Sequence, residues 1–347
     1  MPFQPEPGQG YDGTGLALHF LLGNVTALHP GLKEFWFGWR VKKLFPGKRS
    51  FMRYCRGQDP ELDMMRLGRS QGVRYWVTGK VAVGETIRVR LALTDVRGKG
   101  LKKITHLEVD LQDRLLNFRR EFIGWLSLCG LPMPQSQRQK ALWPEEVTRE
   151  GLRLLGLSME SYYLDAFKAH SMDRSGLDKA AADAPRSYLI RDLHAWALYK
   201  NDRMAAAARE FQAALDLNPD GLGAMAGLMW CAVKAGDEKR AYDWGMKKAG
   251  LRGDDPLEAR AGVANRLGNE ALKKKDFQKA ARLYGRAVSW HPGKMLYVKK
   301  KVDALRQSGR LEEAFETLIQ ALDAAEKAED RKALLRMKDE LSMGDVK

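Results

Sequence analysis

The chain has 347 residues, of which 44% are hydrophobic and 30% are charged. This length favours two or three domains, and the apolar share is ample for packed cores. The longest apolar runs are far shorter than a bilayer, so we expect no membrane span. The net charge of +15 favours acidic partners, whether a protein, a nucleic acid or an anionic lipid surface.

Residues that could carry chemistry are scattered along the chain. Cys55, Cys129 and Cys231 are odd in number and far apart, which argues against a disulfide framework and a zinc site. Arg53 and Arg56 flank Cys55 and would favour a thiolate, but we interpret this cysteine as structural. The six histidines show neither metal spacing nor a neighbouring nucleophile. We therefore predict no metal, no cofactor and no enzymatic activity.

The first residues contain a glycine-rich loop. Gly8, Gly10 and Gly13 match the spacing of a dinucleotide-binding loop, which requires a strand before it and a helix after it. A helix follows but no full strand precedes, so nucleotide binding is a minor alternative. The first thirty residues show no signal-peptide pattern. We expect a cytoplasmic protein, or a periplasmic one if an upstream segment is missing.

Residues 1–130 predict an α/β domain with a small mixed sheet and helices. A leucine-rich stripe indicates a helix over 18–28, and Asp59-Pro60 starts a second helix that Gly72 ends. Alternation then predicts strands over 77–83 and 87–93, a turn over 95–100 and a third strand over 105–110. A helix over 115–126 follows.

A basic and aromatic stretch lies at 35–56. Together with further lysines and arginines at 97–103, it could hold phosphates while its rings stack on bases. A solvated basic surface is the simpler interpretation, and an acidic protein face or an anionic lipid is a third. The predicted basic surface consists of Arg40, Lys42, Lys43, Lys48, Arg49 and Arg53.

Two adjacent strands carry a family resemblance. Residues 72–81 read Gly-Val-Arg-Tyr-Trp-Val-Thr-Gly-Lys-Val, and 87–95 read Ile-Arg-Val-Arg-Leu-Ala-Leu-Thr-Asp. They resemble the TolB amino-terminal-like domain, which often precedes helical repeats in bacterial regulatory and envelope proteins. The resemblance implies protein contact or sensing and no catalysis. That family opens with a strand ending in Leu-Pro-Phe, whereas this chain begins with Met1-Pro2-Phe3.

The first strand is therefore absent, supplied by a partner chain, or lost to the choice of start. An open sheet edge would allow another chain to pair with it. The next segment, residues 131–150, is predicted to be a linker.

The carboxy-terminal half contains a helical repeat. Gly268, Ala280, Tyr284, Ala287 and Pro292 have the same spacing as Ala195, Ala207, Phe211, Ala214 and Pro219. Antiparallel helices approach closely where one presents a small side chain, so this spacing predicts stacked helical hairpins. The pattern resembles the tetratricopeptide repeat (TPR). We predict an all-α superhelical solenoid of four to five units over 151–328 and a capping helix over 329–347.

In that family the first helices of successive units line a concave groove. The matching positions predict a partner-binding groove formed by Trp196, Tyr199, Trp230, Asn265, Asn269, Lys273 and Lys299. The tryptophans could equally be packed against each other or against the adjacent domain. The first hypothesis is a non-enzymatic adaptor that binds an acidic protein segment. The alternative is a nucleic-acid-associated protein that uses the basic face of the amino-terminal domain.

Overall fold

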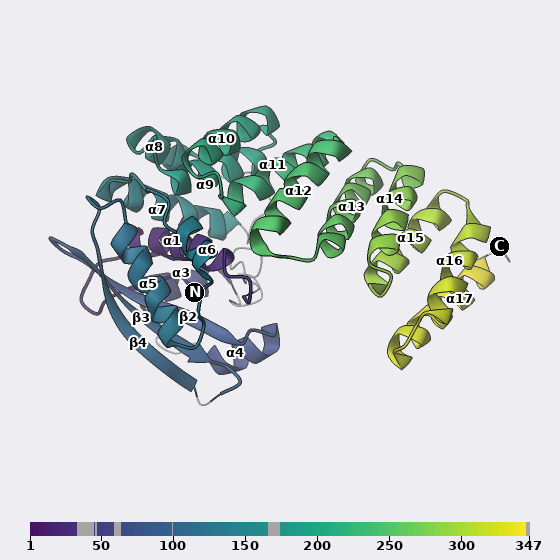
Figure 1. The fold of residues 1–347 in the computed structure, drawn as a ribbon, viewed down its shortest axis with the longest axis horizontal. Coiled ribbons are helices and arrows are strands. Elements are labelled where there is room, and N and C mark those ends of the chain that lie inside the picture. Colours follow the sequence, from purple (N-terminus) through teal and green to yellow (C-terminus); the bar gives the residue numbers. More distant parts are fainter. Residues whose placement is uncertain (33–44, 46, 59–63, 99, 166–173, 345–347) are drawn as a thin grey trace. The chain divides into compact units, whose positions relative to one another are not determined.

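The computed structural model describes residues 1–32, 45, 47–58, 64–98, 100–165 and 174–344 (Figure 1). The chain divides into two compact units, Met1–Gly227 and Leu228–Lys347. The boundary lies within helix α11 (Leu222–Ala235). Among the described residues, no helix combines the length and the apolar character needed to cross a membrane.

The first unit contains a four-stranded mixed sheet, of which the sequence predicts three strands. Its strands are β1 (Gln4–Pro5), β2 (Tyr75–Val83), β3 (Ile87–Asp95) and β4 (Gly100–Val109), in spatial order β1-β2-β3-β4. β2–β3 and β3–β4 are antiparallel, while β1 runs parallel to β2. Val89, Leu91 and Leu93 are buried and alternate with exposed Arg88 and Arg90, so one sheet face belongs to the core.

Helices pack around this sheet and continue beyond it. The helices of the first unit are α1 (Thr14–Ala27), α3 (Lys48–Cys55), α4 (Met64–Gln71), α5 (Leu116–Leu128), α6 (Gln135–Lys140), α7 (Arg149–Asp165), α8 (Ser175–Asp183), α9 (Tyr188–Lys200) and α10 (Met204–Leu217). α1 and α5 contact the sheet, and α1 also packs along α7. The predicted helices over 18–28 and 115–126 correspond to α1 and α5.

Three local features differ from the sequence-based expectations. β4 begins at Gly100, before the predicted 105–110, because an edge strand tolerates charged residues that hide the alternation. Helix α3 lies within the basic and aromatic stretch, for which no helix was predicted, and it buries Phe51, Tyr54 and Cys55 at helical spacing. A first strand is present, since Gln4 and Pro5 pair with Lys80 and Val81 of β2.

Residues 141–147, which fall within the predicted linker, are largely buried in the first unit. Ala141 and Glu145 are at most 1% exposed, and Trp143 is 5% exposed. The Trp143 indole N–H donates to Glu145 Oε2 at 2.6 Å, and Ser187 Oγ and the Leu189 amide donate to the other carboxylate oxygen. This segment therefore joins the sheet domain to α9 by buried polar contacts.

The second unit stacks antiparallel helix pairs. After the end of α11 come α12 (Glu238–Arg252), α13 (Pro256–Lys273), α14 (Phe277–Trp290), α15 (Met295–Gln307), α16 (Leu311–Asp323) and α17 (Ala328–Gly344). The predicted small residues are at the contacts: Ala280 and Ala287 are fully buried, and a Cβ on Gly268 would lie 2.7 Å from the Tyr284 ring. Leu334 of α17 completes the same core.

Candidate functional site

The second unit carries a polar and aromatic surface on α11, α13 and α15. Arg266 of α13 lies over Trp230 of α11, with its guanidinium carbon 5.4 Å from the ring centroid. Burial lowers the pKa of Arg266, although the nearby Tyr297 opposes this. Within the described residues no carboxylate pairs with Arg266. Stacking on an indole face therefore holds a guanidinium whose N–H donors remain available.

Next to this pair, α13 and α15 share a hydrogen-bond network. Lys300 Nζ donates to Asn265 Oδ1 at 2.8 Å and to Asn269 Oδ1 at 2.7 Å. The Tyr284 hydroxyl donates to the same oxygen of Asn269 at 2.9 Å. Desolvation lowers the pKa of Lys300. Because the carbonyl oxygens are used, each amide keeps its NH₂ group free for a further acceptor.

Other charged residues of this surface form ion pairs in part, and positive side chains outnumber negative ones. Glu270 is buried and pairs with Lys273 at 2.5 Å and with Lys234 at 3.9 Å. Lys299 is half-buried and forms no ion pair with any described residue. Asp303, one turn beyond Lys300 on α15, supplies an exposed carboxylate. We name Trp230, Asn265, Arg266, Asn269, Lys299 and Lys300 the α11–α15 surface.

Two predicted groove residues belong to the first unit. Trp196 and Tyr199 are half-buried on α9, where the indole meets the Tyr199 ring edge-on at 5.6 Å and the Phe211 ring at 5.2 Å. Trp196 therefore packs on the second helix of its own pair. In the second unit, Arg266 of α13 contacts Trp230 of α11, and Lys300 of α15 contacts Asn265 and Asn269 of α13. Trp196 and Tyr199 form their own aromatic cluster on α9.

The predicted basic surface lies only partly within the described residues. Arg40, Lys42 and Lys43 lie outside them, whereas Lys48, Arg49 and Arg53 are exposed on α3. On the inner side of α3, burial raises the pKa of the Cys55 thiol, with a smaller contribution from Glu160. Cys55 is therefore a protonated core residue, in agreement with the structural interpretation.

Of the three loop glycines, Gly13 serves packing, whereas Gly8 and Gly10 have no close neighbour among the described residues. A Cβ on Gly156 of α7 would lie 1.8 Å from the Gly13 carbonyl oxygen, so α1 and α7 are in contact through these two glycines. Asp12 accepts from the Thr14 amide and the Thr14 hydroxyl, each at 2.9 Å. A carboxylate already occupies the amino terminus of α1, and it would repel a pyrophosphate there.

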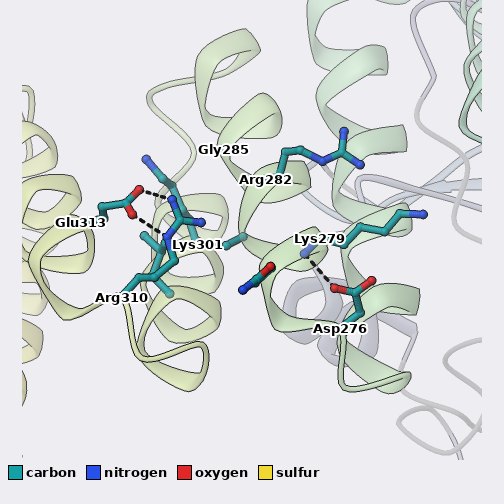
Figure 2. Close-up of a pocket in the computed structure, with 10 residues that line it drawn as sticks. Asp276, Lys279, Arg282, Gly285, Lys301, Arg310 and Glu313 are labelled. Atoms are coloured by element: carbon teal, nitrogen blue, oxygen red, sulfur yellow. Dashed lines mark hydrogen bonds and ion pairs between the residues drawn. The ribbon is translucent and has the colours of Figure 1, made fainter.

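A surface pocket of about 630 Å³ lies between α14, α15 and α16 (Figure 2). Arg310 and Glu313 pair on one wall beside Lys301, and Ala281, Gly285 and Leu305 are among the lining residues. Lys279 and Arg282 point away from this wall, and both pair with Glu238. No group of three His, Cys, Asp or Glu residues suited to a metal exists in the described part of the chain.

Sequence reasoning missed Arg266 and Lys300. Their signal is the repeat spacing: Arg266 stands 36 residues after Trp230, and Lys300 stands 35 and 31 residues after Asn265 and Asn269. Offsets near one repeat length place side chains on neighbouring parallel helices. The charge of a helical arginine or lysine suggests a solvated face, which concealed both residues.

No family model matches the chain, and no curated protein sequence matches it. Several solved structures resemble the helical part. YrrB, described as a TPR protein with an unusual peptide-binding site, is 17% identical, with a TM-score of 0.29 over 48% of this chain and 86% of that chain. MamA from Desulfovibrio magneticus RS-1 is 14% identical, with a TM-score of 0.35 over 51% of this chain and 96% of that chain. A MamA RS-1 double mutant is 14% identical, with a TM-score of 0.36 over 56% of this chain and 98% of that chain.

Proposed function

We propose that this protein is a non-enzymatic adaptor whose second unit binds an extended protein segment on the α11–α15 surface. The observation that carries the proposal is the half-buried Arg266, stacked on Trp230 with no carboxylate partner among the described residues. A desolvated guanidinium with free donors gains most from an acceptor on another molecule. The fixed aromatic ring also reduces the entropy lost on binding.

The chemistry of the neighbouring groups indicates an acidic segment. The two asparagine amides can donate to backbone carbonyls of the segment, while Lys300 and Lys299 add positive charge. Asp303 is the one exposed carboxylate that we find on this part of α15, so the local charge is positive. A carboxylate side chain opposite Arg266 would make a bidentate pair, which fixes the register of the segment.

The setting of the adaptor follows from the resemblance of residues 72–95 to the TolB amino-terminal-like domain. We place the protein in a bacterial regulatory or envelope-associated assembly, in which the first unit makes further protein contacts. A helical-repeat surface suits this role because it presents side chains from several helices along one extended face. Genes encoded beside this one would offer the first partner candidates to test.

An array of 12-residue peptides, graded in Asp and Glu content, tests the proposal on the full chain. Arg266→Ala should weaken the best acidic binders by about tenfold, since one charge-assisted contact is lost. Lys247→Ala is the matched control, because Lys247 also stacks on an indole, that of Trp244, at 5.2 Å. Equal losses in both variants, or binding that ignores the acidic content, would contradict the proposal.

A further inference from the structure

The two edges of the sheet in the first unit differ. The β2 edge is covered by the first residues: the Met1 amine donates to the Val77 carbonyl at 3.1 Å, and the Glu6 amide donates to the Val81 carbonyl at 2.9 Å. The Val83 amide donates to Gln9 Oε1 at 3.1 Å. The edge that the sequence predicts to be open is therefore occupied in the structure.

The other edge is formed by β4, and nine of its ten residues pair with β3 on one side. Outside that ladder, residues 103–109 take part in no hydrogen bond with the described part of the chain. An antiparallel strand directs half of its N–H and C=O groups away from each neighbour. β4 therefore offers a row of free backbone groups, with Ile104 exposed to 37% beside them.

The register of the sheet gives this edge a pattern of charge. Lys80 of β2, Arg90 of β3 and His106 of β4 form one row across the solvent face, and Arg90 and His106 are exposed. The next row runs Ala82, Arg88 and Glu108, and the row on the other side runs Thr78, Ala92 and Ile104. No described carboxylate forms an ion pair with Lys80, Arg88 or Arg90.

We propose that the β4 edge binds an extended strand of a protein partner in antiparallel pairing. Directly opposed side chains on one face interact most strongly, and opposite charges favour the pair. The partner strand therefore carries an acidic residue opposite His106, a basic residue opposite Glu108 and an apolar residue opposite Ile104. Read in the partner's chain direction, the motif is basic-x-acidic-x-apolar. This inference concerns the first unit and is independent of the α11–α15 surface.

Other occupants fit this edge less well. A second copy paired around Leu107 would match His106 with Glu108, but it would set Asp110 opposite Ile104, where the edge calls for an apolar residue. A single-stranded nucleic acid needs exposed rings for base stacking. In the three rows the His106 imidazole is the one ring that could stack, so phosphate contacts would have to supply most of the binding.

Fluorescence anisotropy of two labelled peptides with the full chain tests the proposal. One peptide contains Lys-Thr-Glu-Thr-Val, and the other contains Glu-Thr-Lys-Thr-Val, which has the same composition with the two charges exchanged. The exchange turns attraction at Glu108 into repulsion and sets a lysine in place of a glutamate in the row of Arg90, so the first peptide should bind about fivefold tighter. Its binding should also slow amide hydrogen exchange within residues 103–109.

A charge-reversal variant distinguishes register recognition from general attraction. Arg90→Glu combined with His106→Glu should remove the preference between the two peptides, because the row at position 106 becomes acidic while Glu108 still favours the first peptide. The control combines Lys48→Glu with Arg49→Glu on α3, changes the net charge by at least as much and should keep the original preference. Three results would each overturn the proposal. The wild-type protein could bind both peptides equally, or its amide hydrogen exchange in 103–109 could stay unchanged. The third is a dimer seen by sedimentation that Arg90→Glu with His106→Glu abolishes.

Discussion

The two units differ in where they keep their titratable side chains. The first unit buries them: Arg119 and Asp192 are fully buried, and Glu145 is 1% exposed. In the second unit Glu238 is held by Lys279, Arg282 and Arg286 at the helix surface, and the buried Glu270 reaches lysines at the rim. Buried charges make a unit sensitive to single substitutions and to alkali, whereas surface pairs make it sensitive mainly to acid.

The largest expected effect comes from Arg119→Ala. Arg119 donates to the carbonyls of Leu115 at 3.0 Å, Arg114 at 3.1 Å and Ala141 at 3.4 Å, and also to that of Trp143. Removing it leaves these acceptors and Glu145 without their cation, so the free energy of unfolding should fall by about 3–5 kcal/mol. Urea denaturation of the first unit measures this change.

Arg120→Ala is the matched control for that experiment, because Arg120 is the exposed neighbour on the same helix. It should change the free energy of unfolding by less than about 0.5 kcal/mol. Similar losses at both positions would show that the buried guanidinium has no special part in the first unit.

Small residues in the two units should also respond differently. Gly156→Ala places a Cβ against the Gly13 backbone, which cannot rotate away, and should cost about 3 kcal/mol. Gly268→Ala meets the Tyr284 ring, which can shift, and should cost about 1–2 kcal/mol. Thermal unfolding of both variants compares them. A larger loss for Gly268→Ala would reverse this order and contradict the contact geometry.

The first unit should lose stability as the pH rises. Burial raises the pKa of Asp192 from 3.8 to about 8, Glu145 adds to the rise, and the Trp196 indole opposes it. The folded state therefore holds a proton that the unfolded chain releases, so stability falls between these two values as pH increases. Asp192→Asn should reduce this slope by roughly 1 kcal/mol per pH unit.

Urea titrations at pH 5, 6, 7 and 8 check the effect of Asp192→Asn. Glu145, whose pKa burial also raises, should leave a residual slope of the same sign in the variant. Parallel lines for the wild type and the variant would show that Asp192 is ionised in the folded protein at neutral pH.

The smallest effect concerns the second unit, where the sign is opposite. Burial opposes ionisation of Glu238, but its contacts with Arg282 and Arg286 outweigh this and lower its pKa. Its contribution is present above the unfolded pKa and is lost as the pH falls through the folded value. Glu238→Gln should cost about 1 kcal/mol at pH 7 and nothing at pH 3, measured by hydrogen exchange in α12 and α14. A loss that persists at pH 3 would exclude the ion pairs as its cause.

The helix pairs were predictable from sequence because their contacts repeat. Gly268, Ala280 and Ala287 recur at fixed spacing, and each one marks a close approach of two helices. The sheet was predictable from alternation, which Val89 and Leu91 follow with Arg88 and Arg90 opposite. Periodic patterns of this kind report local geometry, so they identify elements and their inner faces.

The buried segment 141–147 was not predictable, because its sequence pattern occurs only once and its contact partners are distant in sequence. Glu145 receives hydrogen bonds from Ser187 and Leu189, more than forty residues away, and nothing near Glu145 indicates that it is buried. The candidate site has the same limit. Asn269 follows from the spacing within one repeat, whereas Lys300 is found only by comparing two neighbouring repeats, because its charge by itself suggests a solvated face.

The contacts within each unit also have a mechanical consequence. The helix pairs beyond Leu228 hold mainly their immediate neighbours, so a force applied at the carboxy terminus would detach α17 first and then release one pair after another. In the first unit, hydrogen bonds tie Thr148 to Asp183 and Glu145 to Ser187. Because such contacts join residues that are distant in sequence, they would bear the force together. The first unit would therefore resist extension until it unfolds as a whole.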